Sequence, residues 1–433
     1  MGDPPPEKHN HTTLPFPDDF LWGAATSAHQ VEGNNFNNQW WEWEQTLPKE
    51  KQSQDATDHY HRFEEDFAFA KEYGHNAHRL SIEWSRIEPS EGNFDEFEIK
   101  HYHKVFKSLK AKNMKIMLTL HHFTDPLWIT RMGGWENKKT ASYFNRFVER
   151  VVREYKEDID LWITLNEPGI YGWGGYLDGR FPPGKKSLWK TLKVIFNLAS
   201  AHKKAFKTIH QMIPNAKVGM AQNIVSFGNQ QIHSIIQHIL VYIYDLAFNH
   251  FFYILTPRTH DFLGINYYFH ERVGILEGRK MPQILDATMT KKDVSDLGWE
   301  LYPEGIFDAL KDLSGFKLPI YITENGLAST NDDRRCRFLI AYLKEIYHAI
   351  ESGVDVRGYF HWSLTDNFEW AEGFRPRFGL IEIDYATKKR IPRLSAQVYR
   401  DIIRHNGIPH HLMRFIGHTV NAKEVLEKMK KIE

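Results

Sequence analysis

The sequence predicts an α/β fold, a (β/α)8 TIM barrel built as a single domain. Eight short, β-rich apolar runs alternate with longer segments of helical periodicity along the 433 residues. This alternation is typical of βα units and a parallel sheet. No linker divides the chain, and no glycine-rich phosphate loop follows the first predicted strand, which weakens a dinucleotide-binding alternative. Eight units favour a closed barrel over an open sheet.

Each strand and helix is predicted from its own pattern. Residues 115–120 read Lys-Ile-Met-Leu-Thr-Leu, an apolar run expected of a parallel strand that is buried on both faces. Over Tyr143–Tyr155, apolar residues recur at three- and four-residue spacing, which predicts a helix. The predicted strands are Phe20–Ala28, Asn76–Trp84, Lys115–His121, Leu161–Asn166, Lys217–Val225, Asp261–Tyr268, Pro319–Glu324 and Val356–Ser363.

The predicted barrel occupies most of the chain. Residues 1–13 are polar and proline-rich and are expected to form a flexible tail. Residues 14–418 form the predicted barrel, and residues 419–433 a short, charged C-terminal helix. A barrel with loop insertions accommodates this length, and a chain of this size needs no metal or disulfide for stability.

Composition excludes several classes of function. Lysine plus arginine and aspartate plus glutamate both number 55, so no overall charge favours binding to nucleic acid or to a membrane surface. Cys336 is the single cysteine, which excludes an intramolecular disulfide and a cysteine-based metal site. The N-terminus shows no apolar signal segment, so we expect a cytoplasmic protein. Aromatic residues make up 14%, which buried packing or a sugar-stacking cleft would both explain.

Polar side chains stand at the carboxyl ends of the predicted strands, where barrel enzymes carry their chemistry. Any one of them is more often a satisfied core group or a loop cap, but together they converge on one rim. They are His29-Gln30, Arg79, His121-His122, Asn166-Glu167, Asn223, Asn266-Tyr267-Tyr268, Glu324-Asn325 and His361-Trp362.

Two glutamates are the principal candidates for catalysis. Glu167 precedes Pro168, and Glu324 precedes Asn325-Gly326, so each carboxylate follows the last residues of a strand. Glycoside cleavage needs two carboxyl groups, about 5–5.5 Å apart in retaining enzymes and farther apart in inverting ones. Taken alone, both glutamates could be surface acids, which is the commonest fate of this residue type.

The chain resembles glycoside hydrolase family 1, the β-glucosidase family, from Phe16 to about Ile408. Seven segments in the same order carry the resemblance. They are residues 20–27 (FLWGAATS), 30–33 (QVEG), 58–62 (DHYHR), 164–168 (TLNEP), 261–268 (DFLGINYY), 322–326 (ITENG) and 362–370 (WSLTDNFEW).

The resemblance implies a retaining β-glycosidase. Glu324 is expected to attack the anomeric carbon, and Glu167 to act as the acid and then as the base. Arg79 and Tyr268 match positions that contact the nucleophile, and Asn166 matches the amide that binds the sugar 2-hydroxyl. Asn266 is expected, like these three residues, to support the catalytic glutamates. The implied substrate-binding residues are Gln30, His122, Trp299, Trp362, Glu369 and Trp370.

The resemblance also bears on the substrate. Members that act on 6-phosphorylated sugars replace the acid at Glu369, and a carboxylate there would repel a phosphate. We therefore predict neutral β-glucosides, together with β-galactosides and β-fucosides, as substrates. Two alternatives remain: a catalytically inactive sugar-binding barrel, which would ordinarily lose a catalytic glutamate, and an enzyme that acts mainly as a transglycosylase.

Two departures from the family pattern are visible. Phe123 replaces a tryptophan whose ring NH can donate to the sugar, which leaves the preference between gluco and galacto configurations open. The span from Ser226 to His260 is shorter than usual, which predicts a wider or more mobile leaving-group side. The histidine pairs 59/61, 101/103 and 121/122 lack a complete ligand set, so we expect no metal and no cofactor.

Overall fold

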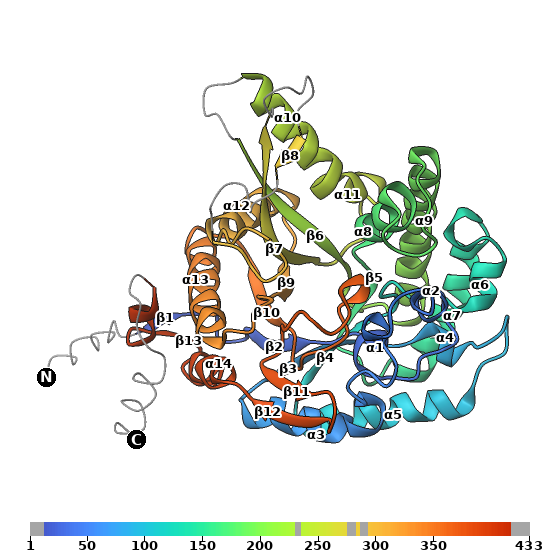
Figure 1. Ribbon diagram of the computed structural model, residues 1–433, viewed down its shortest axis with the longest axis horizontal. Helices are drawn as coiled ribbons and strands as arrows, with labels where there is room; N and C mark the ends of the chain where they lie inside the picture. The colour runs from blue at the N-terminus through green and yellow to red at the C-terminus, as the bar shows by residue number, and fades with distance from the viewer. Residues whose placement is uncertain (1–12, 230–234, 275–282, 286–292, 417–433) are drawn as a thin grey trace, which may run out of the picture.

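A computed structural model describes residues 13–229, 235–274, 283–285 and 293–416, and the barrel predicted from the sequence is confirmed. Eight parallel strands lie in the order β6-β5-β4-β3-β2-β10-β9-β7, and a further pairing of β6 with β7 closes the cylinder. Figure 1 shows these strands at the centre with helices around them. The strands are β2 (Leu21–Ala25), β3 (Ala77–Ser81), β4 (Lys115–Thr119), β5 (Leu161–Asn166), β6 (Val218–Asn229), β7 (Leu263–Gly274), β9 (Ile320–Asn325) and β10 (Val356–Trp362).

All eight predicted strands exist; β9 ends one residue beyond its predicted end, and two others extend four or more residues beyond theirs. β6 continues to Asn229 and β7 to Gly274, past the rim, where Ser226 pairs with His270 and Asn229 with Val273. The antiparallel strand β8 (Gln283–Leu285) then pairs with β7. Polar residues in this stretch concealed the strands, because a projecting ribbon is not enclosed by helices and needs no continuous apolar run.

The helices cover the barrel from outside. In α7 (Thr140–Tyr155) the apolar residues that predicted a helix, including Phe144, Phe147 and Val151, are fully buried. The side chain of Asp95 accepts hydrogen bonds from two amides at the start of α5 (Glu96–Ala111), which caps that helix. The other long helices are α3 (His59–Glu72), α9 (Leu188–Met212), α12 (Glu304–Leu313), α13 (Asp332–Glu351) and α14 (Leu394–Arg404).

The two ends of the described chain lie together. β1 (Thr13–Pro15) pairs antiparallel with β13 (Gly407–Pro409), and Asn406 accepts a hydrogen bond from the indole of Trp22 at the start of β2. Residue 13, counted with the tail in the sequence prediction, therefore belongs to a strand. Residues 1–12 and 417–433 lie outside the described residues, so the tail and the C-terminal helix stay predictions.

The span from Ser226 to His260 is mainly helical. It contains α10 (Ile235–Asp245), a π-helical turn η4 (Leu246–His250) and α11 (Phe251–Leu255). Asn249 donates to the carbonyl of Val225 and accepts from its amide, and Phe248 packs on Trp173 with ring centroids 3.9 Å apart. This packing counts against a mobile wall at η4. A wider leaving-group side stays a prediction.

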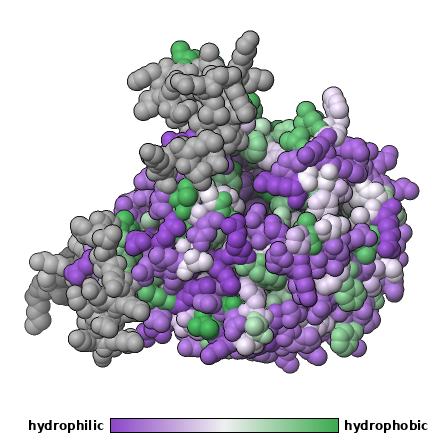
Figure 2. All heavy atoms as spheres, in the orientation of Figure 1, coloured by the Kyte–Doolittle hydropathy of each residue, from purple (hydrophilic) through white to green (hydrophobic). Residues whose placement is uncertain are grey.

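The outer face of this helical segment is apolar. Among the described residues, His238–Leu255 is long and apolar enough to cross a membrane by length and composition, and 17% of it is buried. Within this segment Asn249, Phe252 and Tyr253 are buried, whereas Ile239, Tyr242 and Ile243 are exposed. The face of the molecule in Figure 2 is mainly hydrophilic, with apolar side chains between the polar ones. The predicted cytoplasmic location and absence of a membrane partner remain untested.

Candidate active site

A cavity of about 240 Å³ opens at the carboxyl ends of the strands. Ten of the twelve predicted site residues line it: Gln30, His122, Asn166, Glu167, Tyr268, Trp299, Glu324, Trp362, Glu369 and Trp370. Arg79 and Asn266, the other two, are fully buried and hydrogen-bond to residues that line the cavity. All twelve therefore belong to one constellation.

Glu324, on β9, is held at both carboxylate oxygens. The guanidinium of Arg79 donates to one oxygen at 2.6 Å, and the hydroxyl of Tyr268 donates to the other at 2.6 Å. Arg79 itself is fixed by bonds to the carbonyl of Thr323 and to the side-chain oxygen of Asn166. Charge-assisted bonds of this kind are about twice as strong as neutral ones and fix the direction of the carboxylate.

Glu167 ends β5 in an unusual backbone conformation. Its φ is +43°, in the left-handed region, and its amide donates to the carbonyl of Ala221 at 2.7 Å. Pro168 follows as the first residue of α8 (Pro168–Trp173). Left-handed backbone is uncommon for residues other than glycine and tends to occur at functional sites. This turn directs the Glu167 side chain into the cavity.

Asn266 connects the two glutamates. It lies opposite Glu324 in the register between β7 and β9, and its amide donates to Glu167 at 2.8 Å. Thr323, next to Glu324, donates to the side-chain oxygen of Asn266 at 2.7 Å and so orients that amide. Asn223 makes a second, longer contact to Glu167 at 3.4 Å. Both acids therefore face one cavity and share a hydrogen-bonded support.

The two glutamates have different environments. Burial, and after it the nearby Glu324 carboxylate, raises the pKa of Glu167 to about 8, against lowering by the bonds from Asn266 and Asn223. Glu167 is therefore mainly protonated at neutral pH. Among the described residues no cation forms an ion pair with Glu167, whereas Arg79 binds Glu324. Environments that separate two acids in this way are typical of an acid and a nucleophile.

His122 lies between two tryptophans. Its ring is stacked on Trp362 and on Trp370, each with centroids 6.0 Å apart and planes 18° apart. Burial, followed by the charges of Arg79 and His121, holds its pKa well below 6.5, so the ring is neutral. Its Nε2 lies 3.2 Å from the amide of Asn166, and its buried Nδ1 has no hydrogen-bond partner among the described residues. When Nε2 accepts from that amide, Nδ1 carries the proton and is free to donate to a ligand.

Glu369 is the third acid in the cavity. Burial is the main reason that its pKa is raised to about 8, and the charges of Glu324 and Glu167 also contribute to this rise. Gln30 donates to it at 3.4 Å and also to the carbonyl of Phe368 at 2.8 Å. Together with His122, Gln30 and Glu369 form a polar part of the cavity that can hydrogen-bond to hydroxyl groups of a ligand.

The cavity also has an apolar lining, from which the sequence predicted Trp299 on the leaving-group side. Ile170, Phe181, Phe269 and Phe378 also line it. Phe269 directly follows Tyr268 at the predicted end of its strand, whereas Phe181 and Phe378 are brought in by loops, which left no signal in the sequence. Asn223 was identified as a strand-end residue, but its bond to Glu167 was not foreseen.

Histidines from the pairs noted in the sequence interact with aspartate side chains. His59, His61 and His121 each lie within 3 Å of an aspartate. Among the described residues, Asp245, His250 and Asp312 form the one cluster with metal-binding geometry, and none of the three lines the cavity. Hydrogen bonds from His250 to the two aspartates raise its pKa to about 10, so an ion-paired imidazolium accounts for this cluster.

Comparison with known proteins decides the family. The model of glycosyl hydrolase family 1 matches residues 12–231 and 248–408. The chain belongs to glycosyl hydrolase family 1. It is a glycoside hydrolase, and the unmatched residues between the two parts, 232–247, include all of α10.

Relatives of this family 1 hydrolase match over nearly their whole length. A β-galactosidase from Pyrococcus woesei is 30% identical, with 91% of this chain and 98% of the relative covered. β-Glucosidase A from Thermotoga maritima is 29% identical, with 91% and 98% covered. The solved structure of a β-glycosidase from Pyrococcus horikoshii is 36% identical, with 94% and 99% covered and a TM-score of 0.87.

Proposed function

We propose that this family 1 hydrolase is a retaining β-glycosidase that acts on neutral β-glucosides, and also on β-galactosides and β-fucosides. The observation that carries the proposal is the contrast between the two glutamates. Glu324 is held by Arg79 and Tyr268, whereas Glu167 bonds to neutral amides and has a raised pKa. One acid is thus ready to attack and the other to give up a proton.

In the first step, an oxygen of Glu324 attacks the anomeric carbon while Glu167 protonates the departing glycosidic oxygen. The bond to the leaving group breaks as the bond to Glu324 forms. In the second step, Glu167 removes a proton from water, which attacks the anomeric carbon and releases Glu324. Once Glu324 is esterified its charge is gone, so the proton affinity of Glu167 falls, as a base requires.

The polar side of the cavity is proposed to hold the sugar. His122 offers a free Nδ1–H, Gln30 and Glu369 face the outer hydroxyls, and Trp362 with Trp370 forms the stacking wall. Asn166, held by Arg79, is proposed to bind the 2-hydroxyl. Trp299 and its apolar neighbours would contact the leaving group.

Glu369 supports neutral substrates over phosphorylated ones. Its carboxyl lies in a cavity that already contains Glu167 and Glu324. A phosphate here would add negative charge to a buried site that already holds the carboxylate of Glu324, and it would disfavour any ionisation of Glu369, which is unfavourable in such a site. A 6-phosphoglucoside that is cleaved faster than the neutral glucoside would contradict this assignment.

The test is a kcat/KM panel on aryl β-glucoside, β-galactoside, β-fucoside and β-glucoside-6-phosphate. Glu324→Gln should lose several orders of magnitude on every substrate, while Glu91→Gln, a change at an exposed acid, should leave the rates unchanged. NMR of the first sugar released should show the β-anomer. Release of the α-anomer would refute the retaining route, and no turnover by the wild type would favour a sugar-binding barrel.

A further inference from the structure

The loop between β10 and the short helix η7 (Trp370–Glu372) carries Glu369 to the cavity. Residues 363–369 of this loop have no regular secondary structure, apart from a bridge between Thr365 and Ile381. The position of the Glu369 carboxyl therefore depends on what holds the loop.

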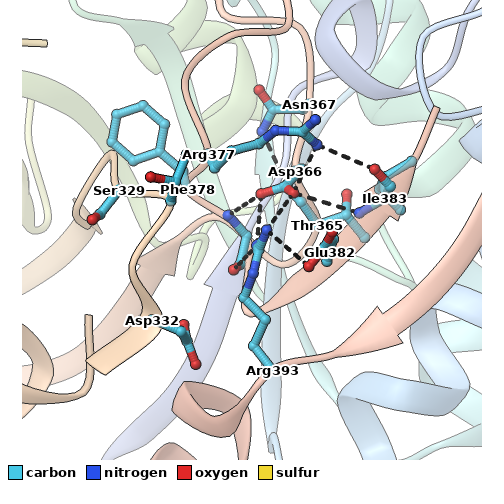
Figure 3. A network of polar contacts seen from close by, with 12 residues as sticks. Ser329, Asp332, Thr365, Asp366, Asn367, Arg377, Phe378, Glu382, Ile383 and Arg393 are labelled. Carbon is cyan, nitrogen blue, oxygen red and sulfur yellow. Dashed lines mark hydrogen bonds and ion pairs between the residues drawn. The ribbon is translucent and has the colours of Figure 1, made fainter. Parts of the chain in front are cut away.

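Asp366 is the centre of that support. Its side chain is fully buried, and neither oxygen faces the cavity lining. Arg393 donates to both oxygens at 2.8 Å, Arg377 donates at 3.1 Å, and the amide of Gly379 donates at 2.9 Å. Figure 3 shows the guanidinium groups of Arg377 and Arg393 converging on Asp366. The charge-assisted hydrogen bonds between this carboxylate and two guanidinium groups are the strongest polar interactions in the loop.

The loop around Asp366 packs closely against residues 379–383. A β-carbon on Gly379 would lie 2.1 Å from the amide nitrogen of Asp366. The backbone of Asp366 also donates to the carbonyl of Ile381 at 2.9 Å. Asp366 thus fixes its own loop against residues 379–383, and a small change in its bonds must move one of the two segments.

The support also reaches the loop that follows Glu324. The carbonyl of Arg377 accepts from the amide of Ser329 at 2.9 Å and from the buried guanidinium of Arg335 at 2.6 Å. Arg335 donates to the carbonyl of Ser329 as well, at 2.6 Å. One network therefore joins the loops after β9 and β10, the two strands that lead to Glu324 and Glu369.

A short chain of bonds leads from Asp366 to Glu369. The next residue, Asn367, donates to Ser363 and accepts from Gln30 at 3.2 Å. Gln30 in turn binds the carbonyl of Phe368 and the carboxyl of Glu369. The amide of Glu369 is fixed by the carbonyl of Gly373 at 2.7 Å.

We propose that Asp366 is a positioning residue that sets the selectivity for the outer hydroxyls of the sugar by fixing the loop that carries Glu369. The proposal rests on the proposed function, because it assigns those hydroxyls to Glu369. Asp366 touches no substrate and acts through Asn367, Gln30 and the loop backbone.

The test substitution is Asp366→Asn, which keeps the shape and removes the charge. An amide NH2 would then face guanidinium donors, so the loop must shift. The matched control is Glu382→Gln, because Glu382 is half exposed and, among the described residues, forms an ion pair only with Arg393, at 3.6 Å. β-Galactoside and β-fucoside are the substrates, since a fucoside lacks only the 6-hydroxyl.

Asp366→Asn should lower kcat/KM on β-galactoside about 10- to 100-fold, the effect of a displacement of about 1 Å. The loss on β-fucoside should be several-fold smaller, and Glu382→Gln should change neither. In a Glu369→Gln background, Asp366→Asn should cost little more, because the carboxyl that it positions is already gone. Equal losses on both sugars, together with additivity with Glu369→Gln, would overturn the proposal.

Two further measurements keep the test decisive. Binding of galactose and of fucose, measured by calorimetry, should show the same change of ratio, and it separates this proposal from the proposed function because it needs no turnover. If Asp366→Asn does not fold, Arg393→Lys removes the two-point contact but keeps the charge. A folded Arg393→Lys variant with an unchanged galactose-to-fucose ratio would also overturn the proposal.

Discussion

The raised pKa of Glu167 has a consequence for stability that needs no substrate to measure. The carboxyl has a pKa of about 8 in the folded chain and an ordinary value near 4.5 when unfolded. Between these values the folded state binds one more proton than the unfolded state, so Glu167 lowers the free energy of unfolding as pH rises. The loss begins near pH 4.5 and is complete near pH 8. Glu167→Gln has no ionisable group at this position, so it should not show this pH-dependent loss of stability.

The magnitude follows from the size of the shift. Each pH unit in this window changes the free energy of unfolding by about 1.4 kcal/mol, so pH 5 to pH 8 gives about 4 kcal/mol. At about 2.1 cal/mol/K per residue, a chain of 433 residues has an unfolding entropy of about 0.9 kcal/mol/K. Glu167→Gln should therefore match the wild-type Tm at pH 5 and exceed it by about 4 °C at pH 8.

Differential scanning calorimetry at half-unit pH steps measures this gap. The substitution keeps an oxygen for the bond from Asn266, so near-equality at pH 5 is expected. The exposed acid variant Glu91→Gln should show no growing gap. A Tm difference for Glu167→Gln that stays constant from pH 5 to pH 8 would refute the environment assigned to Glu167.

Four other outcomes are expected. The kcat/KM on an aryl β-glucoside should fall as pH rises through about 8, because Glu167 then loses the proton it must donate; a plateau to pH 10 would oppose this. Tyr268→Phe removes a 2.6 Å bond to a buried carboxylate and should cost about 2 kcal/mol, or about 30-fold in kcat/KM, with an unchanged Tm excluding misfolding as the cause. Gly326→Ala would place a β-carbon 1.8 Å from the carbonyl of Trp362, so both Tm and activity should fall, while Gly315→Ala, with open space around it, should change neither. Incubation with a chelator should leave the rate within about twofold, since the proposed steps need no metal; loss that added Zn²⁺ restores would contradict that expectation.

Much of this fold was predictable because its signals are local. Strand β5 has the predicted bounds, and α7 begins three residues before the predicted segment, because apolar runs and helical periodicity are set by burial in the barrel wall. The ends of β6 and β7 were not predictable from apolar runs, since Ser226, His270 and Glu271 lie on a ribbon that leaves the barrel.

The site was predictable where a residue follows a strand, and less so where loops contribute. Glu167 directly follows β5, while Glu324 and Asn266 lie on β9 and β7 at the rim where the strands converge. Phe181 and Phe378 reach the cavity from loops whose course depends on long-range contacts. The bonds of Asp366 join residues up to 27 positions apart, and no spacing rule in the sequence reveals such a network.

The pairing of β1 with β13 places the beginning and end of the barrel next to each other, beside the start of β2 and thus at the end of the cylinder opposite the cavity. A short peptide joining the two ends, with new termini cut in a surface loop, should yield a circular permutant that retains the barrel. The same arrangement means that a tether attached at either strand holds the protein by the end where the barrel strands begin, with the entrance for substrate directed away from the support.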